Sequence, residues 1–233
     1  MSVPPSVPIT VVAATGPGRE VDRFALEHGA DPVRELARRG WAVLRVESAD
    51  VVGAVMQLRY AVAAATPAPA STRAVPTDPG LVVAEGERPE PYQRTAAYGV
   101  VTSVRGVLLT ELSDRTAAPG RWTLPGGGLD PGEPPLAALH REVWEESGQR
   151  VDAPELIEVT TSHWVGRAPG GRLEDFHAVR VVYAAWCAEP SDPVVHDVGG
   201  STASVEWVAP EDLASRPLTG FAASLPRWLG PAR

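Results

Sequence analysis

The sequence predicts an α/β protein in two parts, a small α/β N-terminal domain over residues 1–88 and a larger α/β domain over residues 89–233. Short apolar runs alternate with helical patterns in the first part, and a series of strand-like runs interrupted by one helix makes up the second. Six prolines between Ala65 and Tyr92 predict a linker or an extended connection between the two. A chain of 233 residues, 44% of them hydrophobic, can bury a sizeable core.

The first part predicts a β-α-β-α unit. Ile9–Ala14 is a short apolar run typical of a buried strand, and Trp41–Val46 alternates as a second strand. Between them, Asp31 offers an N-cap followed by a proline, which predicts a helix that ends at Gly40. The length and the Ala, Leu and Met content of Val51–Ala65 predict a second helix. A unit of this size is marginal alone, so we expect it to pack on the rest of the chain or on a second copy in a homodimer.

The second part predicts a set of strands around one helix. The strands are expected at Ala96–Val101, Gly106–Leu112, Leu156–Ser162, Phe176–Cys187 and Val205–Val208.

The helix in the second part is expected to begin near Pro134 and to end at Gly148, because its first turn tolerates proline and glycine favours its end. At about 100° per residue, Leu136, Leu139 and Val143 form its core face. The same arithmetic places His140 on the buried side, as a packed core histidine, and no two of the five histidines stand at metal-ligand spacing.

Composition excludes several classes of partner. With 21 basic and 29 acidic residues, the net charge of −8 repels phosphate backbones, so we expect no nucleic-acid polymer as partner. No apolar run approaches the roughly 20 residues of a membrane span, and Met1–Pro8 lack the pattern of a secretory signal. We therefore expect no membrane contact and a cytoplasmic location. The single cysteine, Cys187, is expected to be a buried small hydrophobe.

Three carboxylates share one stripe of the predicted helix: Glu142, Glu145 and Glu146. Side by side they repel one another, and a divalent cation with oxygen ligands compensates this charge. Mg²⁺ is the expected ion, with Mn²⁺ as the alternative. Considered alone, a Glu-rich helix is more often a solvated acidic face, here with Arg141 as a surface partner.

The residues around the helix favour the metal site. Leu124-Pro125-Gly126-Gly127-Gly128 lies just upstream, and its glycines allow the backbone to approach other groups closely. The spacing G-x5-E-x7-R-E-x-x-E-E-x-G is complete in Gly127, Glu133, Arg141, Glu142, Glu145, Glu146 and Gly148. The segment therefore resembles the Nudix box, and the surrounding strands extend the resemblance over Tyr92–Arg233. Gln149, where the family usually has an aliphatic residue, is a departure, and Val151 is expected to supply the apolar contact.

The resemblance implies an α/β/α sandwich with a mixed sheet and a hydrolase that cleaves the diphosphate linkage of a nucleoside diphosphate derivative. By analogy, Glu142, Glu145 and Glu146 would bind the metal, with Glu145 and Glu146 as catalytic residues. Arg141 would hold the glutamates by charge-assisted hydrogen bonds. Gly126, Gly127 and Gly128 would contact substrate, and Glu133 would support the helix start or act as a favourable charge near the helix dipole. Arg121 is a candidate phosphate clamp and equally an ordinary surface arginine.

Many members of the family place a further acidic residue before the last strand. Asp197, in His196-Asp197-Val198-Gly199-Gly200-Ser201-Thr202, takes that position here and is expected to be catalytic, with a surface turn as the alternative. Glu174 and Asp175 are the competing candidates.

Two functions remain open on the sequence. The first is a Mg²⁺-dependent pyrophosphohydrolase acting on a small nucleotide derivative, such as a nucleotide sugar, an ADP-ribose-like compound or a nucleoside triphosphate. The second is a non-hydrolytic nucleotide sensor with a regulatory N-terminal domain. Because the glutamates and Arg141 are intact, the sequence favours the enzyme.

Overall fold

The computed structural model describes residues 7–69, 74–168 and 170–230. This part of the chain falls into two compact units, each made of segments that are distant in sequence. Unit 1 comprises the chain up to Ala96 with Leu129–Pro135 and Glu158–Val181; unit 2 comprises Ala97–Gly128, Leu136–Ile157 and the chain from Val182 onward. Among the described helices, none has the length and apolar character needed to cross a bilayer.

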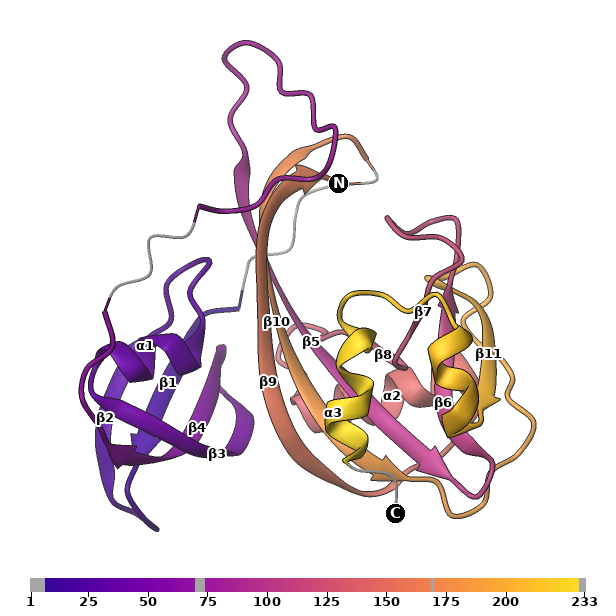
Figure 1. The fold of residues 1–233 in the computed structure, drawn as a ribbon, viewed down its shortest axis with the longest axis horizontal. Coiled ribbons are helices and arrows are strands. Elements are labelled where there is room, and N and C mark those ends of the chain that lie inside the picture. The colour runs from indigo at the N-terminus through magenta and orange to yellow at the C-terminus, as the bar shows by residue number, and fades with distance from the viewer. Residues whose placement is uncertain (1–6, 70–73, 169, 231–233) are drawn as a thin grey trace. The chain divides into compact units, whose positions relative to one another are not determined.

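The N-terminal part of unit 1 is a mixed four-stranded sheet with one short helix (Figure 1). Its strands pair in the order β2-β1-β4-β3, with β1 and β4 parallel and the other pairs antiparallel. The elements are β1 (Ile9–Ala14), β2 (Glu20–Ala25), α1 (Pro32–Arg38), β3 (Trp41–Val52) and β4 (Val55–Ala64).

The expected β-α-β-α order is wrong at two places. Glu20–Ala25 forms β2, which the sequence did not indicate, and in place of the helix expected over Val51–Ala65 the chain forms the end of β3, a turn and strand β4. Met56, Leu58 and Tyr60 are buried at every second position of β4, which is the pattern of a strand with one face packed against the core, and β4 pairs with β1 and β3. Sheet pairing on both sides therefore overrides the helical propensity of its Ala, Leu and Met content. The helix α1 begins as expected, with the Asp31 side chain accepting a hydrogen bond from the Arg34 backbone N–H at 2.9 Å.

The proline-rich stretch is an extended connection that is bound to strand β9 within unit 1. The backbone N–H of Val165 donates to the Pro76 carbonyl and that of Asp78 to the Val165 carbonyl, each at 2.9 Å. The Arg167 guanidinium donates to both carboxylate oxygens of Glu87, at 2.8 and 2.7 Å. These hydrogen bonds lower the pKa of Glu87 to about 2.

The second sheet contains all five predicted strands of the larger domain. Its order is β11-β6-β5-β10-β9, with β7 on β6 and β8 on β5. The strands are β5 (Glu90–Ser103), β6 (Gly106–Leu112), β7 (Trp122–Thr123), β8 (Gly126–Gly128), β9 (Asp152–Arg167), β10 (Leu173–Trp186) and β11 (Thr202–Val208). The remaining elements are α2 (Pro135–Ser147), η1 (Pro210–Ser215), η2 (Ala222–Ser224) and α3 (Leu225–Leu229). Cys187, just after β10, is buried and free, as expected.

Helices cover both faces of the unit 2 part of this sheet (Figure 1). Neighbouring residues of a strand point to opposite faces. On β5, a Cβ at Gly99 would lie 3.0 Å from a methyl carbon of Leu139 on α2. The next residue, Val100, packs in a core cluster with Leu213 of η1 and Leu225 of α3. The arrangement is the expected α/β/α sandwich.

Helix α2 has the expected bounds, but its buried face is rotated from the predicted one. Leu139 and Val143 are fully buried, whereas Leu136 is 42% exposed and His140 is exposed. His140 is therefore not a core histidine. The buried face of α2 is centred close to Glu146. The apolar pattern of the sequence did not include this residue, because a glutamate is not expected to be buried.

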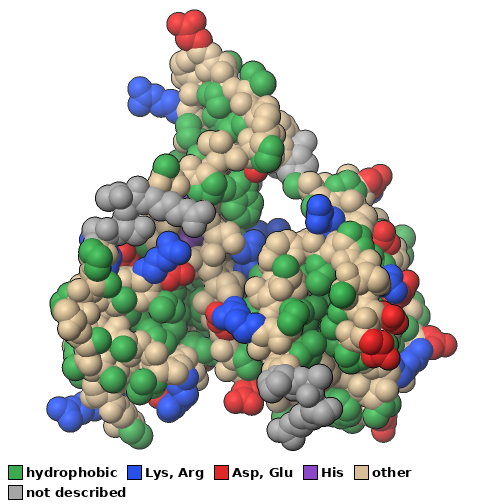
Figure 2. All heavy atoms as spheres, in the orientation of Figure 1, with side chains coloured by type: hydrophobic (Ala, Val, Ile, Leu, Met, Phe, Trp, Pro, Cys, Tyr) green, Lys and Arg blue, Asp and Glu red, His purple; other side chains and the backbone are tan. Residues whose placement is uncertain are grey.

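Charged side chains of both signs are spread over the surface. On the face drawn in Figure 2, the described acidic and basic side chains are interspersed among scattered hydrophobic groups. Such a distribution is usual for a folded protein surface.

Candidate active site

The glycine loop of unit 2 lies against β5 and α2 at distances that only glycine permits. A Cβ at Gly126, whose φ is +141°, would lie 2.2 Å from the Ala97 carbonyl oxygen. A Cβ at Gly127 would lie 2.5 Å from Oε1 of Glu142. The loop backbone is thus in direct contact with the helix that carries the glutamates.

Arg141 connects three groups of this site. Its guanidinium donates to Glu142 at 2.9 Å, to Glu145 at 3.1 Å and to the Gly128 carbonyl at 3.0 Å. One cation thus lies between two carboxylates and fixes them to the glycine loop. Such charge-assisted bonds are stronger than neutral ones and set the direction of both side chains.

Glu146 is the most buried of the three glutamates, with 6% of its surface exposed. One carboxylate oxygen accepts the Gly126 backbone N–H at 2.9 Å, and the other accepts the Thr202 hydroxyl at 2.6 Å. Burial, aided by the charges of Glu142 and Asp197, raises the pKa of Glu146 to about 7 against the opposing effect of these two bonds. A bound cation would relieve this burial of negative charge.

The donor set fits a hard divalent cation. Glu142 and Glu146 have little exposed side-chain surface, whereas the Glu145 side chain is 40% exposed, and among the described residues the carboxylate oxygens of the three do not all lie within 4.8 Å of one another. Its donors are carboxylate oxygens, and Gly127 leaves the Glu142 carboxylate room that a side chain would fill. Carboxylates with space for water are the ligands that Mg²⁺ prefers.

Asp197 lies in a loop that is bonded to the C-terminal end of α2. The backbone N–H groups of His196 and Asp197 both donate to the Glu145 carbonyl, at 2.7 and 3.0 Å, and that of Val194 donates to Ser147. The turn places the Asp197 carboxylate directly beside Gly200, where a Cβ would overlap it. The loop brings Asp197 close enough to influence Glu146.

The competing acids have other partners. Glu174 is paired with Arg172, and Asp175 with His163 and His28, all within unit 1. Of the remaining candidates, the Arg121 guanidinium donates to the Leu218 carbonyl at 3.0 Å, and the Glu133 carboxylate accepts the Asp130 backbone N–H at 2.9 Å. The Glu133 contact is a local one at the start of the turn before α2.

Gln149, the departure from the family pattern, is buried with its amide fully used. Its side-chain nitrogen donates to the Ser147 carbonyl at 3.1 Å and to the Ser191 hydroxyl at 3.0 Å, and its oxygen accepts the Ser191 backbone N–H. Val151 is also buried. A polar contact has therefore replaced the usual apolar one without leaving unpaired groups.

The sequence reasoning missed two features. Thr202, the hydroxyl partner of Glu146, stood unnoticed in the stretch that contains Asp197. The second is a group of side chains from distant positions. In the described part of the chain, His28, His163 and Asp175 form the one group of three whose potential metal-ligand atoms all lie within 4.8 Å of one another.

Known proteins resemble this chain over its larger part. A family model described as NUDIX domain matches residues 92–229. A MutT-like protein of Streptomyces ambofaciens is 33% identical over 131 residues, which cover 54% of this chain and 75% of that protein. The nucleoside triphosphatase NudI of Escherichia coli is 31% identical over 124 residues, covering 52% of this chain and 85% of NudI. The structure of a MutT NUDIX hydrolase from Burkholderia pseudomallei is 28% identical, with a TM-score of 0.47, over 57% of this chain and 95% of that one.

Proposed function

The chain belongs to the Nudix hydrolase family, whose members act on pyrophosphate bonds, and we propose that it is a Mg²⁺-dependent pyrophosphohydrolase of nucleoside diphosphate derivatives. One observation carries the proposal. Arg141 and Glu146 tie the helix to the glycine loop through hydrogen bonds to Gly128 and Gly126, and Arg141 also binds Glu142 and Glu145.

In this proposal Glu142, Glu145 and Glu146 hold the metal. Bound Mg²⁺ polarises phosphoryl oxygens and lowers the pKa of an attacking water. The side chains of the protein fix the geometry: Arg141 aligns Glu142 and Glu145, and Thr202 holds Glu146. Asp197 is the proposed base that accepts the proton of the attacking water as the phosphoanhydride bond breaks.

We propose nucleoside triphosphates as the first substrates to test, ahead of nucleotide sugars and ADP-ribose-like compounds. The support is the 31% identity with a nucleoside triphosphatase. The experiment measures phosphate and pyrophosphate release from a panel of these compounds with Mg²⁺ and with Mn²⁺. Turnover supports the enzyme, and tight nucleotide binding without turnover would favour a non-hydrolytic sensor with a regulatory N-terminal domain.

Thr202 is a positioning residue in this scheme, because its hydroxyl acts on Glu146 and not on substrate. The Thr202→Val variant is expected to lower kcat by about 10-fold, since partners of metal ligands typically contribute about 10–100-fold. KM for nucleotide should change little, and the Mg²⁺ concentration that gives half-maximal rate should rise. Thr202→Ser keeps the hydroxyl and is expected to restore the rate; a serine variant as slow as the valine variant would contradict this role.

We further propose that residues 1–88 act as a separate domain that mediates a homodimer, while residues 89–233 carry the catalytic groups. The support is β3, an edge strand of the N-terminal sheet, on which Leu44 is 66% exposed. Edge strands with exposed apolar side chains favour pairing with another chain.

Light scattering should give twice the 24.6 kDa mass of the chain. Leu44→Asp is expected to give monomers, because burying a charge in the interface is unfavourable. Val104→Asp, at another exposed apolar position in the β5–β6 turn, is the control and should leave the mass unchanged. A monomeric wild-type chain would exclude the homodimer.

A further inference from the structure

Three side chains from distant parts of the sequence meet in unit 1, apart from the glutamate site. His28 precedes α1, His163 lies on β9 and Asp175 lies on β10. Nε2 of His163 is 2.5 Å from one carboxylate oxygen of Asp175, and Nε2 of His28 is 3.5 Å from the other. One carboxylate therefore faces two imidazoles, and the potential ligand atoms of all three lie within 4.8 Å.

A fourth side chain, His177 of β10, adds an independent observation. It is fully buried, and its ring centre lies 5.5 Å from that of His28 and 6.0 Å from that of His163. Among the described residues, its Nε2 has no hydrogen-bond partner. A buried nitrogen of this kind is costly unless a ligand or a proton donor reaches it.

Gln93 determines which nitrogen of His177 is free. The amide nitrogen of Gln93 donates to the Val7 carbonyl at 2.8 Å, which turns the amide oxygen toward Nδ1 of His177 at 3.0 Å. The Gln93 oxygen favours the tautomer with the proton on Nδ1 and a lone pair on Nε2, although the Ala30 backbone carbonyl also accepts from this ring. Histidines that bind metals typically donate their other ring N–H to an oxygen in this way.

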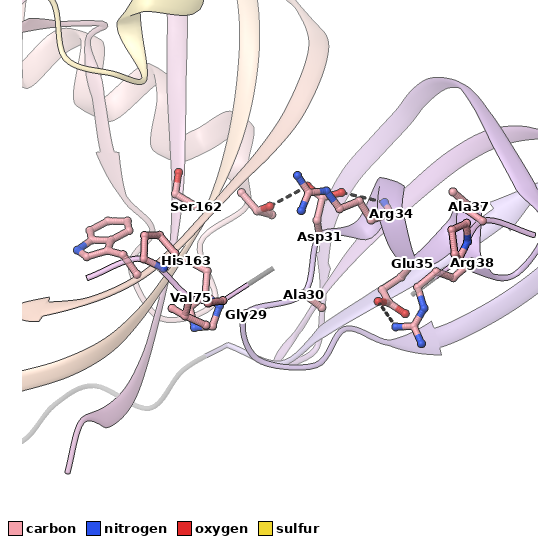
Figure 3. A pocket seen from close by; sticks show the side chains of 16 residues that line it. Gly29, Ala30, Asp31, Arg34, Glu35, Ala37, Arg38, Val75, Ser162 and His163 are labelled. Carbon is pink, nitrogen blue, oxygen red and sulfur yellow. Dashed lines mark hydrogen bonds and ion pairs between the residues drawn. The ribbon is translucent and has the colours of Figure 1, made fainter. Parts of the chain in front are cut away.

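His163 is held against Gly29 at the edge of a cavity. A Cβ at Gly29 would lie 2.4 Å from Cε1 and from Nδ1 of His163, so only glycine lets the backbone lie against this ring. Gly29 and His163 also line a cavity of about 650 Å³, in which Figure 3 shows the His163 ring beside Gly29. Of the three potential ligands, His163 is the one that lines this cavity.

We propose that His28, His163 and Asp175 bind a zinc ion, beside the buried ring of His177. Two or three imidazoles with one carboxylate are a donor set that Zn²⁺ prefers, whereas Mg²⁺ prefers oxygen alone. This site is therefore chemically distinct from the glutamates of α2. The ion would join the loop before α1 to β9 and β10, which identifies the site as a structural one.

The test uses the full chain, freed of metal with a chelator, and titrates it with Zn²⁺ alone by calorimetry. One ion per chain is expected at this site, and Glu146→Gln should retain it, which separates this site from the proposed catalytic one. Loss of a ligand in His163→Asn or Asp175→Asn is expected to weaken zinc binding by about 100-fold or more. His140→Asn, which alters an exposed histidine of α2, is the control and should bind as the wild type does.

A measurement on the wild-type chain covers the case in which a variant fails to fold. With ¹⁵N-labelled histidine, Zn²⁺ should shift the ring nitrogen resonances of His28 and His163 and leave those of His140 unchanged. No zinc uptake, equal affinity in His163→Asn, or shifts confined to His140 and His196 would each overturn the proposal. None of these results depends on hydrolytic activity.

Discussion

Replacing Glu146 by glutamine is expected to lower kcat by about three orders of magnitude while the chain remains folded. The substitution keeps the shape of the side chain and removes a charge from the proposed metal site. Metal-assisted stabilisation of the transition state amounts to several kcal/mol, and about 4 kcal/mol corresponds to about 1000-fold in rate. Phosphate release with saturating Mg²⁺ measures the rate, and circular dichroism with a thermal melt measures the fold.

Glu145→Gln separates the effect on rate from any effect on stability. Glu145 is 40% exposed, so its replacement disturbs packing less than that of the buried Glu146. The same large loss of kcat is expected, with a melting temperature near that of the wild type. Glu155→Gln, at an exposed position of β9, is the matched control and should have wild-type kcat. Wild-type turnover in either box variant would refute the assignment of the glutamates.

Gly126→Ala is expected to lower the free energy of unfolding by about 3 kcal/mol or more, the largest stability effect in the site. A Cβ there would lie 2.2 Å from the Ala97 carbonyl oxygen and 2.7 Å from Cα of Tyr98, both of which are backbone atoms of β5 that cannot turn aside. The φ of +141° adds strain of its own. Urea unfolding followed by tryptophan fluorescence measures the change.

Gly120→Ala is the control for the backbone conformation without the clash. Gly120 has a φ of +75°, and the nearest atom to its added Cβ is 3.9 Å away. Its replacement is expected to cost about 1–2 kcal/mol, the usual penalty for a side chain in the left-handed region. Equal losses for Gly120→Ala and Gly126→Ala would show that the contact with β5 is not what makes Gly126 necessary.

The helix that carries the glutamates was predictable because its signals are local. Prolines in its first turn, Gly148 at its end and the regular spacing of Arg141 and the glutamates all lie within one segment. The strands around it were predictable for the same reason. The segments that became β5, β6, β9, β10 and β11 each carry short apolar runs.

The N-terminal sheet could not be derived in the same way. Val55–Ala64 contains Ala, Leu and Met, which favour a helix, but Met56-Gln57-Leu58-Arg59-Tyr60 also alternates apolar and polar residues as a strand does. A propensity describes the isolated segment, whereas the parallel pairing of β1 with β4 joins residues far apart in sequence. The prediction that His140 is buried failed for a similar reason. The buried face of α2 is centred near Glu146, and a pattern of apolar residues does not reveal a buried glutamate.

The contacts of the sites depend on the tertiary fold. Thr202 meets Glu146 across 56 positions of sequence, and His28 meets Asp175 from another part of the chain. No periodicity brings such residues together. Their residue types alone, a threonine at the start of a strand and histidines at unrelated positions, carry too little information to select them.

Backbone hydrogen bonds join the loop that contains Asp197 to the last turn of α2. Local unfolding of the one is therefore expected to accompany local unfolding of the other. The amide protons of Val194, His196 and Asp197 can exchange with solvent only when they leave the carbonyls of Ser147 and Glu145. Their deuterium uptake should therefore follow the fraying of the last helical turn. A nucleotide that steadies this turn would slow exchange at all three amides together, so isotope labelling can detect occupancy before any substrate is identified.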